Sequence, residues 1–313
     1  MGRGQGRARA IAAAGALLLC GAASPADLPI REARWLQTSD LAGALVHQPA
    51  ECRQRYRDPV LERSAEIGRL AFRAPLLLGG QAARAGLSCA SCHRNGRTNA
   101  DFHFPGISDR PGTADVTASL MSSHRGDGIF NPKPIPDLAG APSTLKVSRD
   151  PNKEDLRRFI HGLVTQEFDG PEPPAAVLDG LTIYVRSLSK SACKGPATVD
   201  VTLEQALGNV ETAVVLARGS FGAGDAGTAQ FLISAARSTL GAIDEHFQVG
   251  KADKSRSILR DADADLRSIA LADHVSAGMF DDWRARWPAR SRALRSAESG
   301  SLYSEATLRK SMN

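Results

Sequence analysis

The chain has 313 residues, of which 42% are hydrophobic and 5% aromatic, and its formal charge is +5. This length predicts two compact units, and the apolar content is sufficient for a folded core, which excludes a disordered chain. Residues 1–26 hold three arginines and no acid, so the remaining chain has 36 basic and 34 acidic residues, and a net charge of +2 gives no strong electrostatic case for nucleic-acid binding.

Residues 1–26 predict a secretory signal peptide. Three arginines precede a short apolar run from Ala10 to Leu19, and small residues follow it. The run is far shorter than the roughly 20 apolar residues that a membrane span needs. We therefore expect a cleaved chain that is exported to the periplasm and has no transmembrane span. A lipid anchor at Cys20 and an uncleaved anchor are the alternatives.

Residues 27–50 predict an irregular lead-in with one amphipathic stretch around Trp35. A helix is predicted over residues 58–72, because Asp58 is a good N-cap and the proline after it suits the first helical position. From residue 95 to residue 149 the chain is rich in Gly, Pro, Ser and Asp, which predicts a long loop. Such a loop in a compact unit is typical of a functional segment, and wrapping a cofactor is one such function.

Two further helices, at about 153–164 and 174–189, are predicted by apolar residues at helical spacing. They close a first unit that extends over about 50–195. The segment after them, residues 190–201, contains a Gly-Pro pair and is interpreted as a linker.

Beyond the linker, helical spacing predicts three more helices and a shorter fourth one that ends before Pro288. These helices predict a small antiparallel bundle at about 200–300, whose role the sequence does not indicate. No alternation typical of strands is present. The predicted fold class is therefore all-α, with a first helical unit followed by the bundle.

One short motif carries chemistry: Cys89-Ala90-Ser91-Cys92-His93 is the C-x-x-C-H pattern of covalent haem attachment. Each thiol of such a motif adds to one vinyl group of the porphyrin, and the two vinyl groups lie along one edge of the ring. Two intervening residues allow one helical turn to present both sulfurs to that edge, and the next histidine reaches the iron. We therefore predict one covalently bound haem c, held by Cys89 and Cys92, with His93 as an axial iron ligand.

The alternatives for this motif are a redox C-x-x-C pair, half of a zinc site, or chance. A thioredoxin-like pair is expected in a βαβ setting, which the sequence does not indicate. A zinc site requires two more close ligands, and no second cysteine pair supplies them. The haem interpretation is preferred, and it makes residues 50–195 a mono-haem cytochrome c domain. Thioether attachment in bacteria also requires an exported setting, which agrees with the predicted signal peptide.

The sixth iron ligand is not determined by the motif. Met121 is the first candidate, because a thioether ligand raises the reduction potential and suits electron transfer. His124, His103 and His161 are the other candidates in this unit, and an open sixth position is a further alternative. Met121 could instead be an ordinary apolar residue that fills a gap in the core.

Two cysteines, Cys52 and Cys193, remain outside the motif and the signal. An oxidising compartment favours pairing them, and a disulfide would join the two ends of the first unit. Two separate thiols are the alternative, because the sequence alone does not bring their Cα atoms within the ~7 Å that a disulfide requires. Arg94 and Arg97 follow the motif and are candidates to pair with the haem propionates.

The segment from about Cys52 to Cys193 resembles bacterial c-type cytochromes of the di-haem cytochrome c peroxidase superfamily. The resemblance lies in the motif, the irregular loop after it, and the stretches Lys133-Pro134-Ile135-Pro136-Asp137-Leu138 and Tyr184-Val185-Arg186-Ser187-Leu188. It implies a helical domain that binds haem. Those peroxidases carry two C-x-x-C-H motifs, one haem for electron entry and one for peroxide reduction. This chain has one motif, so the resemblance does not imply peroxidase activity of that self-contained kind.

These features predict an electron carrier rather than an enzyme, whose iron cycles between Fe(III) and Fe(II) and exchanges electrons with a redox partner protein of the periplasm. A haem peroxidase or oxidase with an open sixth position, and with His124 as an acid–base group, is the second hypothesis. A haem-based redox or gas sensor, with the bundle as its interaction module, is the third.

Overall fold

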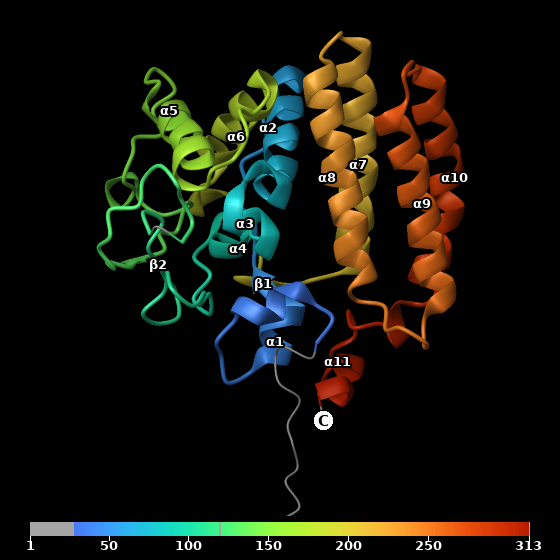
Figure 1. Ribbon diagram of the computed structural model, residues 1–313, viewed down its shortest axis with the longest axis horizontal. Helices are drawn as coiled ribbons and strands as arrows, with labels where there is room; N and C mark the ends of the chain where they lie inside the picture. The colour runs from blue at the N-terminus through green and yellow to red at the C-terminus, as the bar shows by residue number, and fades with distance from the viewer. Residues whose placement is uncertain (1–27, 119, 313) are drawn as a thin grey trace, which may run out of the picture.

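The computed structural model describes residues 28–118 and 120–312 (Figure 1). The expected signal peptide, residues 1–26, lies outside them. Helices dominate the described residues, and the strands are few and short, which confirms the prediction of an all-α protein. No helix among these residues is long and apolar enough to cross a membrane.

Two helices form the frame of the first half of the chain. α2 (Pro59–Phe72) begins where it was predicted, with the Asp58 carboxylate accepting a hydrogen bond of 2.8 Å from a backbone N–H of the first turn. α6 (Ala175–Ser187) lies beside α2 (Figure 1). At their closest approach, a Cβ added to Gly68 would lie 1.9 Å from the carbonyl oxygen of Gly180. Glycine at this position is therefore a requirement of the packing.

A series of short elements follows α2. A 3₁₀ turn at Pro75–Leu77 leads into α3 (Gly80–Ala85) and then into the single-turn helix α4 (Cys89–Cys92). Another 3₁₀ turn, Arg94–Gly96, comes directly after α4. These elements place the motif beside the α2–α6 pair (Figure 1).

The long loop that the composition predicts is present. Its described residues form a small antiparallel ribbon of β2 (Thr113–Ala114) and β3 (Lys133–Pro134) and a 3₁₀ turn at Pro142–Thr144. The loop leads into α5 (Asp155–Gly162), which continues as one π-helical turn at Leu163–Glu167. The loop lies on the side of α4 that faces away from the bundle, and α5 packs against α6 (Figure 1).

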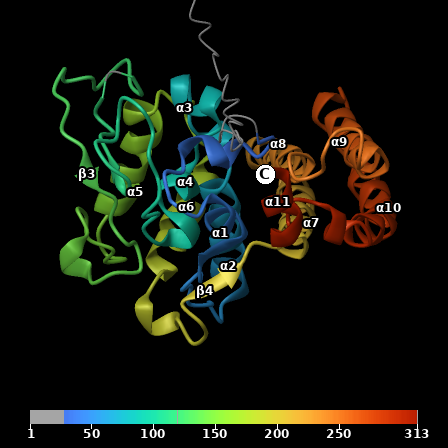
Figure 2. The same ribbon diagram turned by 90° about the horizontal axis from the view of Figure 1, so that it is seen from below.

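The second half of the chain is the expected bundle of antiparallel helices. Its members are α7 (Leu203–Gly222), α8 (Ala226–Asp244), α9 (Asp253–Leu271) and α10 (Ala277–Arg295). Figure 2 shows α7 and α8 between the α2–α6 pair and the outer helices α9 and α10. One continuous apolar cluster runs from α2 and α6 into the bundle, so the two halves share a core.

The fourth bundle helix is longer than the sequence predicted, and Pro288 lies inside α10 instead of ending it. Trp283 and Trp287 precede the proline, are fully buried, and stack with ring centroids 4.7 Å apart. The indole Nε1 of Trp283 also donates a hydrogen bond of 3.1 Å to the carbonyl oxygen of Ala262 in α9. Burial of the two indoles offsets the cost of a proline within a helix, about 3 kcal/mol.

The prediction of an irregular lead-in was wrong, because most of it forms regular elements. After a 3₁₀ turn at Arg31–Trp35 comes α1 (Leu41–Val46), and β1 (His47–Pro49) then pairs antiparallel with β4 (Thr198–Asp200), inside the predicted linker. α11 (Glu305–Met312) packs against α1 at the end of the chain (Figure 1). In the β1–β4 pair, His47 lies opposite Asp200, 153 positions further along the chain. No local pattern in the sequence could therefore indicate this pairing.

Candidate functional site

The two cysteines of the motif lie on one helical turn. Cys89 and Cys92 are the first and last residues of α4, three positions apart and thus on the same side of the turn. At its start, the backbone N–H of Ser88 donates to Ser91 Oγ at 3.0 Å. At its end, Asn99 donates from Nδ2 to the carbonyl of Ser91 and from its backbone N–H to the carbonyl of Cys92, at 2.8 and 2.9 Å. These hydrogen bonds fix the backbone of the turn that carries the two cysteines.

Both motif cysteines are free thiols and half-buried. Cys89 packs against the apolar cluster of α2 and α6, whereas Cys92 packs against a second apolar cluster that includes Phe102 and Met121. Burial raises the pKa of each thiol to about 12, because these surroundings disfavour a thiolate. At neutral pH both groups are protonated thiols that are available for a bond to carbon.

The imidazole of His93 is held by one nitrogen. His93 Nδ1 lies 3.0 Å from the backbone carbonyl oxygen of Pro136. A carbonyl only accepts, so Nδ1 carries the proton of this hydrogen bond. Burial lowers the pKa of His93 to about 4, so the ring is neutral at pH 7 and Nε2 keeps its lone pair. This is the tautomer and the arrangement typical of a histidine that binds a metal through Nε2.

The carbonyl of Pro136 comes from the far part of the long loop, which returns to the motif segment. Leu138 donates its backbone N–H to the carbonyl of Gly96 at 3.0 Å, and Thr98 Oγ1 donates to the carbonyl of Ile135 at 3.0 Å. These bonds bracket Pro136 on both sides. The sequence indicated this stretch only through the family resemblance, and it gave no signal that a backbone oxygen within it would orient the imidazole.

Met121 is the candidate sixth ligand that lies in an apolar environment. Its side chain is 1% exposed and belongs to the apolar cluster against which Cys92 packs. Trp35, Phe102 and Ile107 are members of the same cluster. Met121 thus has the burial expected of a thioether ligand, and also the burial of an ordinary core residue.

The three candidate histidines differ from Met121 in their surroundings. His124 Nδ1 lies 2.8 Å from Asp169 Oδ1, and its side chain is 63% exposed. His161 Nε2 lies 2.8 Å from Glu172 Oε2, on the exposed side of α5. His103 is half-buried, and its backbone N–H bonds to the carbonyl of residue 35. His124 and His161 thus each have one ring nitrogen at hydrogen-bond distance from a carboxylate.

The two arginines after the motif are engaged within the chain. Arg94 is buried, forms an ion pair with Glu32 at 3.0 Å, and donates to the carbonyl of His47 at 3.1 Å. Arg97 forms a two-pronged pair with Asp137, at 2.8 and 2.9 Å. The expectation that these arginines are available to the propionates of a haem is not supported. They fasten the motif segment to the lead-in and to the loop.

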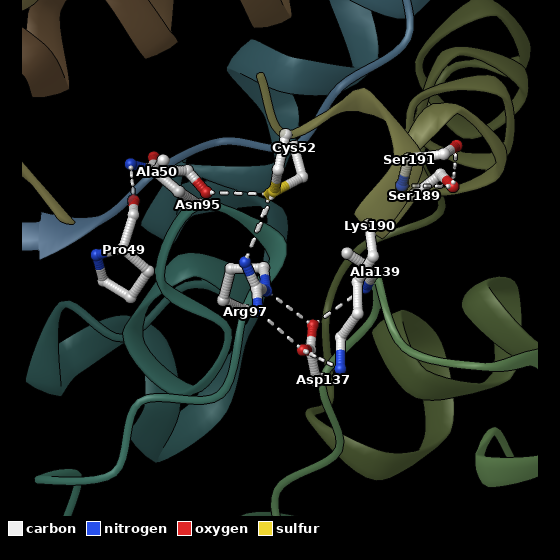
Figure 3. Close-up of a disulfide and its surroundings, with 11 residues drawn as sticks. Pro49, Ala50, Cys52, Asn95, Arg97, Asp137, Ala139, Ser189, Lys190 and Ser191 are labelled. Carbon is white, nitrogen blue, oxygen red and sulfur yellow. Dashed lines mark hydrogen bonds and ion pairs between the residues drawn. A yellow bond between two sulfur atoms is a disulfide. The ribbon is translucent and has the colours of Figure 1, made fainter. Parts of the chain in front are cut away.

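The disulfide between Cys52 and Cys193 is present, with Cα atoms 4.7 Å apart (Figure 3). It joins residues 141 positions apart, at the beginning and at the end of the first half of the chain. Of the two alternatives that the sequence left open, the paired one is confirmed. The disulfide lies against Arg97, four positions after the motif histidine (Figure 3).

A buried polar network, which the sequence did not indicate, lies next to the motif. Glu51 Oε1 accepts from Tyr184 at 2.6 Å and from Arg73 at 2.8 Å, and Arg73 also donates to Asn95 Oδ1 at 2.8 Å. Burial alone would raise the pKa of Glu51, but the charge of Arg73 holds this pKa at about 2. Asn95 adopts φ +50°, a conformation that asparagine tolerates, and its Nδ2 donates to the carbonyl of Pro49.

Comparisons with known proteins add no family to this picture. No family model matches the chain, and no curated protein and no solved structure matches it. Among the described residues, no three His, Cys, Asp or Glu side chains are grouped so as to hold a metal ion.

Proposed function

We propose that the chain is an exported c-type cytochrome with one haem attached through Cys89 and Cys92 and with His93 as an axial iron ligand. The observation that supports this most strongly is the hydrogen bond from His93 Nδ1 to Pro136, directly after a turn with two free thiols. It leaves Nε2 of a neutral imidazole as the donor atom, which is the chemistry that haem iron requires.

The residues around the motif fit a large apolar ligand. Two thiols and one neutral imidazole within five positions match the attachment groups of a haem c. The loop after the motif holds three exposed large apolar side chains, Leu120, Ile129 and Phe130. These side chains leave apolar surface in the loop that a ligand or a partner could cover.

When bound, a haem supplies one-electron oxidation and reduction at its iron. The chain's residues would hold and orient the group: Cys89 and Cys92 through two thioether bonds, and His93 through Nε2. The carbonyl of Pro136 keeps the imidazole in one tautomer and one orientation. Met121 is the proposed sixth ligand, because it is buried in the cluster that Cys92 contacts. The proposed role is electron transfer to a periplasmic redox partner.

The test is to express the full chain in a bacterium that matures c-type cytochromes and to measure the mass of the exported protein. We expect the mass to rise by one haem and the added mass to lie on the peptide that contains residues 89–93. The variant Cys89→Ser/Cys92→Ser should lose the covalent haem. The variant Cys52→Ala/Cys193→Ala is the matched control with two other cysteines removed, and it should keep the haem. An unmodified wild-type chain would contradict the proposal.

A second function is supported by one observation, the pair of His124 and Asp169. The imidazole is exposed, is held by a carboxylate at 2.8 Å, and lies three positions from Met121. Such a pair can exchange protons, as a haem peroxidase or oxidase requires. A high-spin ferric spectrum that changes on adding peroxide, and a loss of peroxide turnover in His124→Gln, would favour this enzyme. A low-spin spectrum that peroxide does not alter would exclude it.

A further inference from the structure

The two sulfurs of the disulfide differ in their access to solvent. Cys52 has no exposed surface, whereas Cys193 lies exposed in the segment after α6. A thiolate that approaches from solvent therefore meets Cys193 first. In thiol–disulfide exchange, the sulfur that is not attacked becomes the leaving group, which here is the sulfur of Cys52.

A cation lies beside that leaving sulfur. Arg97 Nη1 is 3.1 Å from Cys52 Sγ and 3.7 Å from Cys193 Sγ (Figure 3). A disulfide that only fastens two segments needs no charge at this position, and a neutral disulfide sulfur is a weak acceptor. A guanidinium at hydrogen-bond distance stabilises a thiolate more than a thiol, so it favours departure of the Cys52 sulfur.

Several cationic side chains lie near Asp137, the carboxylate that pairs with Arg97. Arg97 is paired with Asp137, and Lys190 Nζ lies 4.0 Å from the same carboxylate. Arg149 is close to Asp137 as well, and in the described part of the chain its guanidinium donates only to backbone carbonyls. Three cations thus surround one carboxylate. An anionic sulfur on Cys52 would reduce this local excess of positive charge.

We propose that the Cys52–Cys193 disulfide is a thiol-exchange site for a dithiol donor. The first donor thiolate attacks Cys193 Sγ, the S–S bond breaks, and its electron pair goes to Cys52, whose thiolate Arg97 stabilises. The second donor thiol then attacks the mixed disulfide and releases Cys193. The donor is oxidised to its disulfide, the two cysteines are reduced, and the two protons of the donor pass to the medium or to the two sulfurs. This site goes beyond the proposed electron transfer and does not depend on it.

The test measures exchange directly on the full exported chain. Glutathione, a monothiol, is used first to trap the mixed disulfide, and alkylation followed by peptide mass spectrometry locates it. The rate of reduction by dithiothreitol is then compared between wild type and Arg97→Gln. We expect glutathione on Cys193, and exchange about 3- to 10-fold slower in Arg97→Gln, because the leaving thiolate has lost its cation.

Two further variants distinguish the loss of the positive charge at position 97 from a general effect of the substitution on folding. Arg97→Lys keeps the positive charge and should keep a rate close to that of wild type. Arg237→Gln removes another arginine from a two-pronged carboxylate pair, with Asp263 in the bundle, and should leave the rate unchanged. Glutathione on Cys52 would overturn the proposal. So would equal rates in wild type and Arg97→Gln, or equal slowing in Arg97→Gln and Arg97→Lys.

The same measurements are repeated in the Cys89→Ser/Cys92→Ser background, which has no motif thiols and cannot attach a haem. The proposed exchange site predicts the same trapped cysteine and the same effect of Arg97→Gln in that background. Failure of the haem proposal would therefore leave this test intact, and failure of this test would leave the haem proposal intact.

Discussion

His93 Nδ1 and the carbonyl oxygen of Pro136 lie 3.0 Å apart, although the two residues are 43 positions apart in the chain. The loop between them is therefore tied at both of its ends to the motif segment. This relationship gives the loop a structural role, since its return fixes the ring that follows the two thiols. It also separates the site into a part that one short motif encodes and a part that only the folded chain supplies.

The identity of the sixth ligand can be tested at Met121. Replacing a thioether by an imidazole stabilises the ferric state, so Met121→His should keep a low-spin spectrum and lower the reduction potential on the order of 100 mV. Met121→Ala should give a high-spin ferric spectrum. Potentiometric titration followed by absorption measures both effects. Met279→Ala, in α10 of the bundle, is the matched control and should alter neither; an unchanged potential in Met121→His would exclude Met121 as a ligand.

The disulfide should stabilise the fold substantially. It closes a segment of 141 residues, and removing such a link typically costs about 2–5 kcal/mol. We expect Cys52→Ala/Cys193→Ala to lower the free energy of unfolding by that amount in urea denaturation. Reduction of the wild-type disulfide should produce a loss of similar size. A loss below about 1 kcal/mol in both experiments would show that the disulfide has little role in stability.

Glu51 should make stability depend on pH in the acid range. Its pKa is about 2 in the folded chain, below its ordinary value of 4.5, so its contribution is fully present above pH 4.5 and is lost as the pH falls toward 2. The loss should reach about 3 kcal/mol. Denaturation between pH 5 and pH 2 should therefore show a shallower slope in Glu51→Gln. Glu211→Gln, on the exposed side of α7, should keep the wild-type slope.

The contact between α2 and α6 can be tested with one methyl group. In Gly68→Ala the new Cβ would lie 1.9 Å from the carbonyl oxygen of Gly180, which is backbone and cannot move aside alone. We expect a loss of about 3 kcal/mol or more in the free energy of unfolding. Gly208→Ala is the matched control, since its Cβ would meet nothing within 4 Å in α7, and it should stabilise by about 0.5–1 kcal/mol.

Local signals in the sequence were sufficient for elements that depend on local physics. Asp58 and the proline after it located the start of α2, because capping is a matter of neighbouring residues. Apolar spacing predicted the bundle helices for the same reason. Pro288 misled the prediction for α10, since the buried Trp283 and Trp287 outweigh the local cost of the proline.

Apart from the disulfide, which the two cysteines left over outside the motif indicated, features that depend on distant partners could not be predicted from the sequence. The strands β1 and β4 pair across 153 positions, and the lead-in that contains β1 has no pattern typical of a strand. The motif was sufficient to propose Cys89, Cys92 and His93 as site residues. It gave no information on the carbonyl of Pro136, because every residue has a carbonyl and only the path of the loop selects this one.

Covalent haem attachment is tested by a pyridine haemochrome spectrum of the purified, exported wild-type protein, recorded with a count of haem per chain. The proposal predicts one haem c per chain, with the absorption of two thioether bonds, and its complete absence in Cys89→Ser/Cys92→Ser. A wild-type protein without haem c, from a host whose own c-type cytochromes are matured normally, would contradict it.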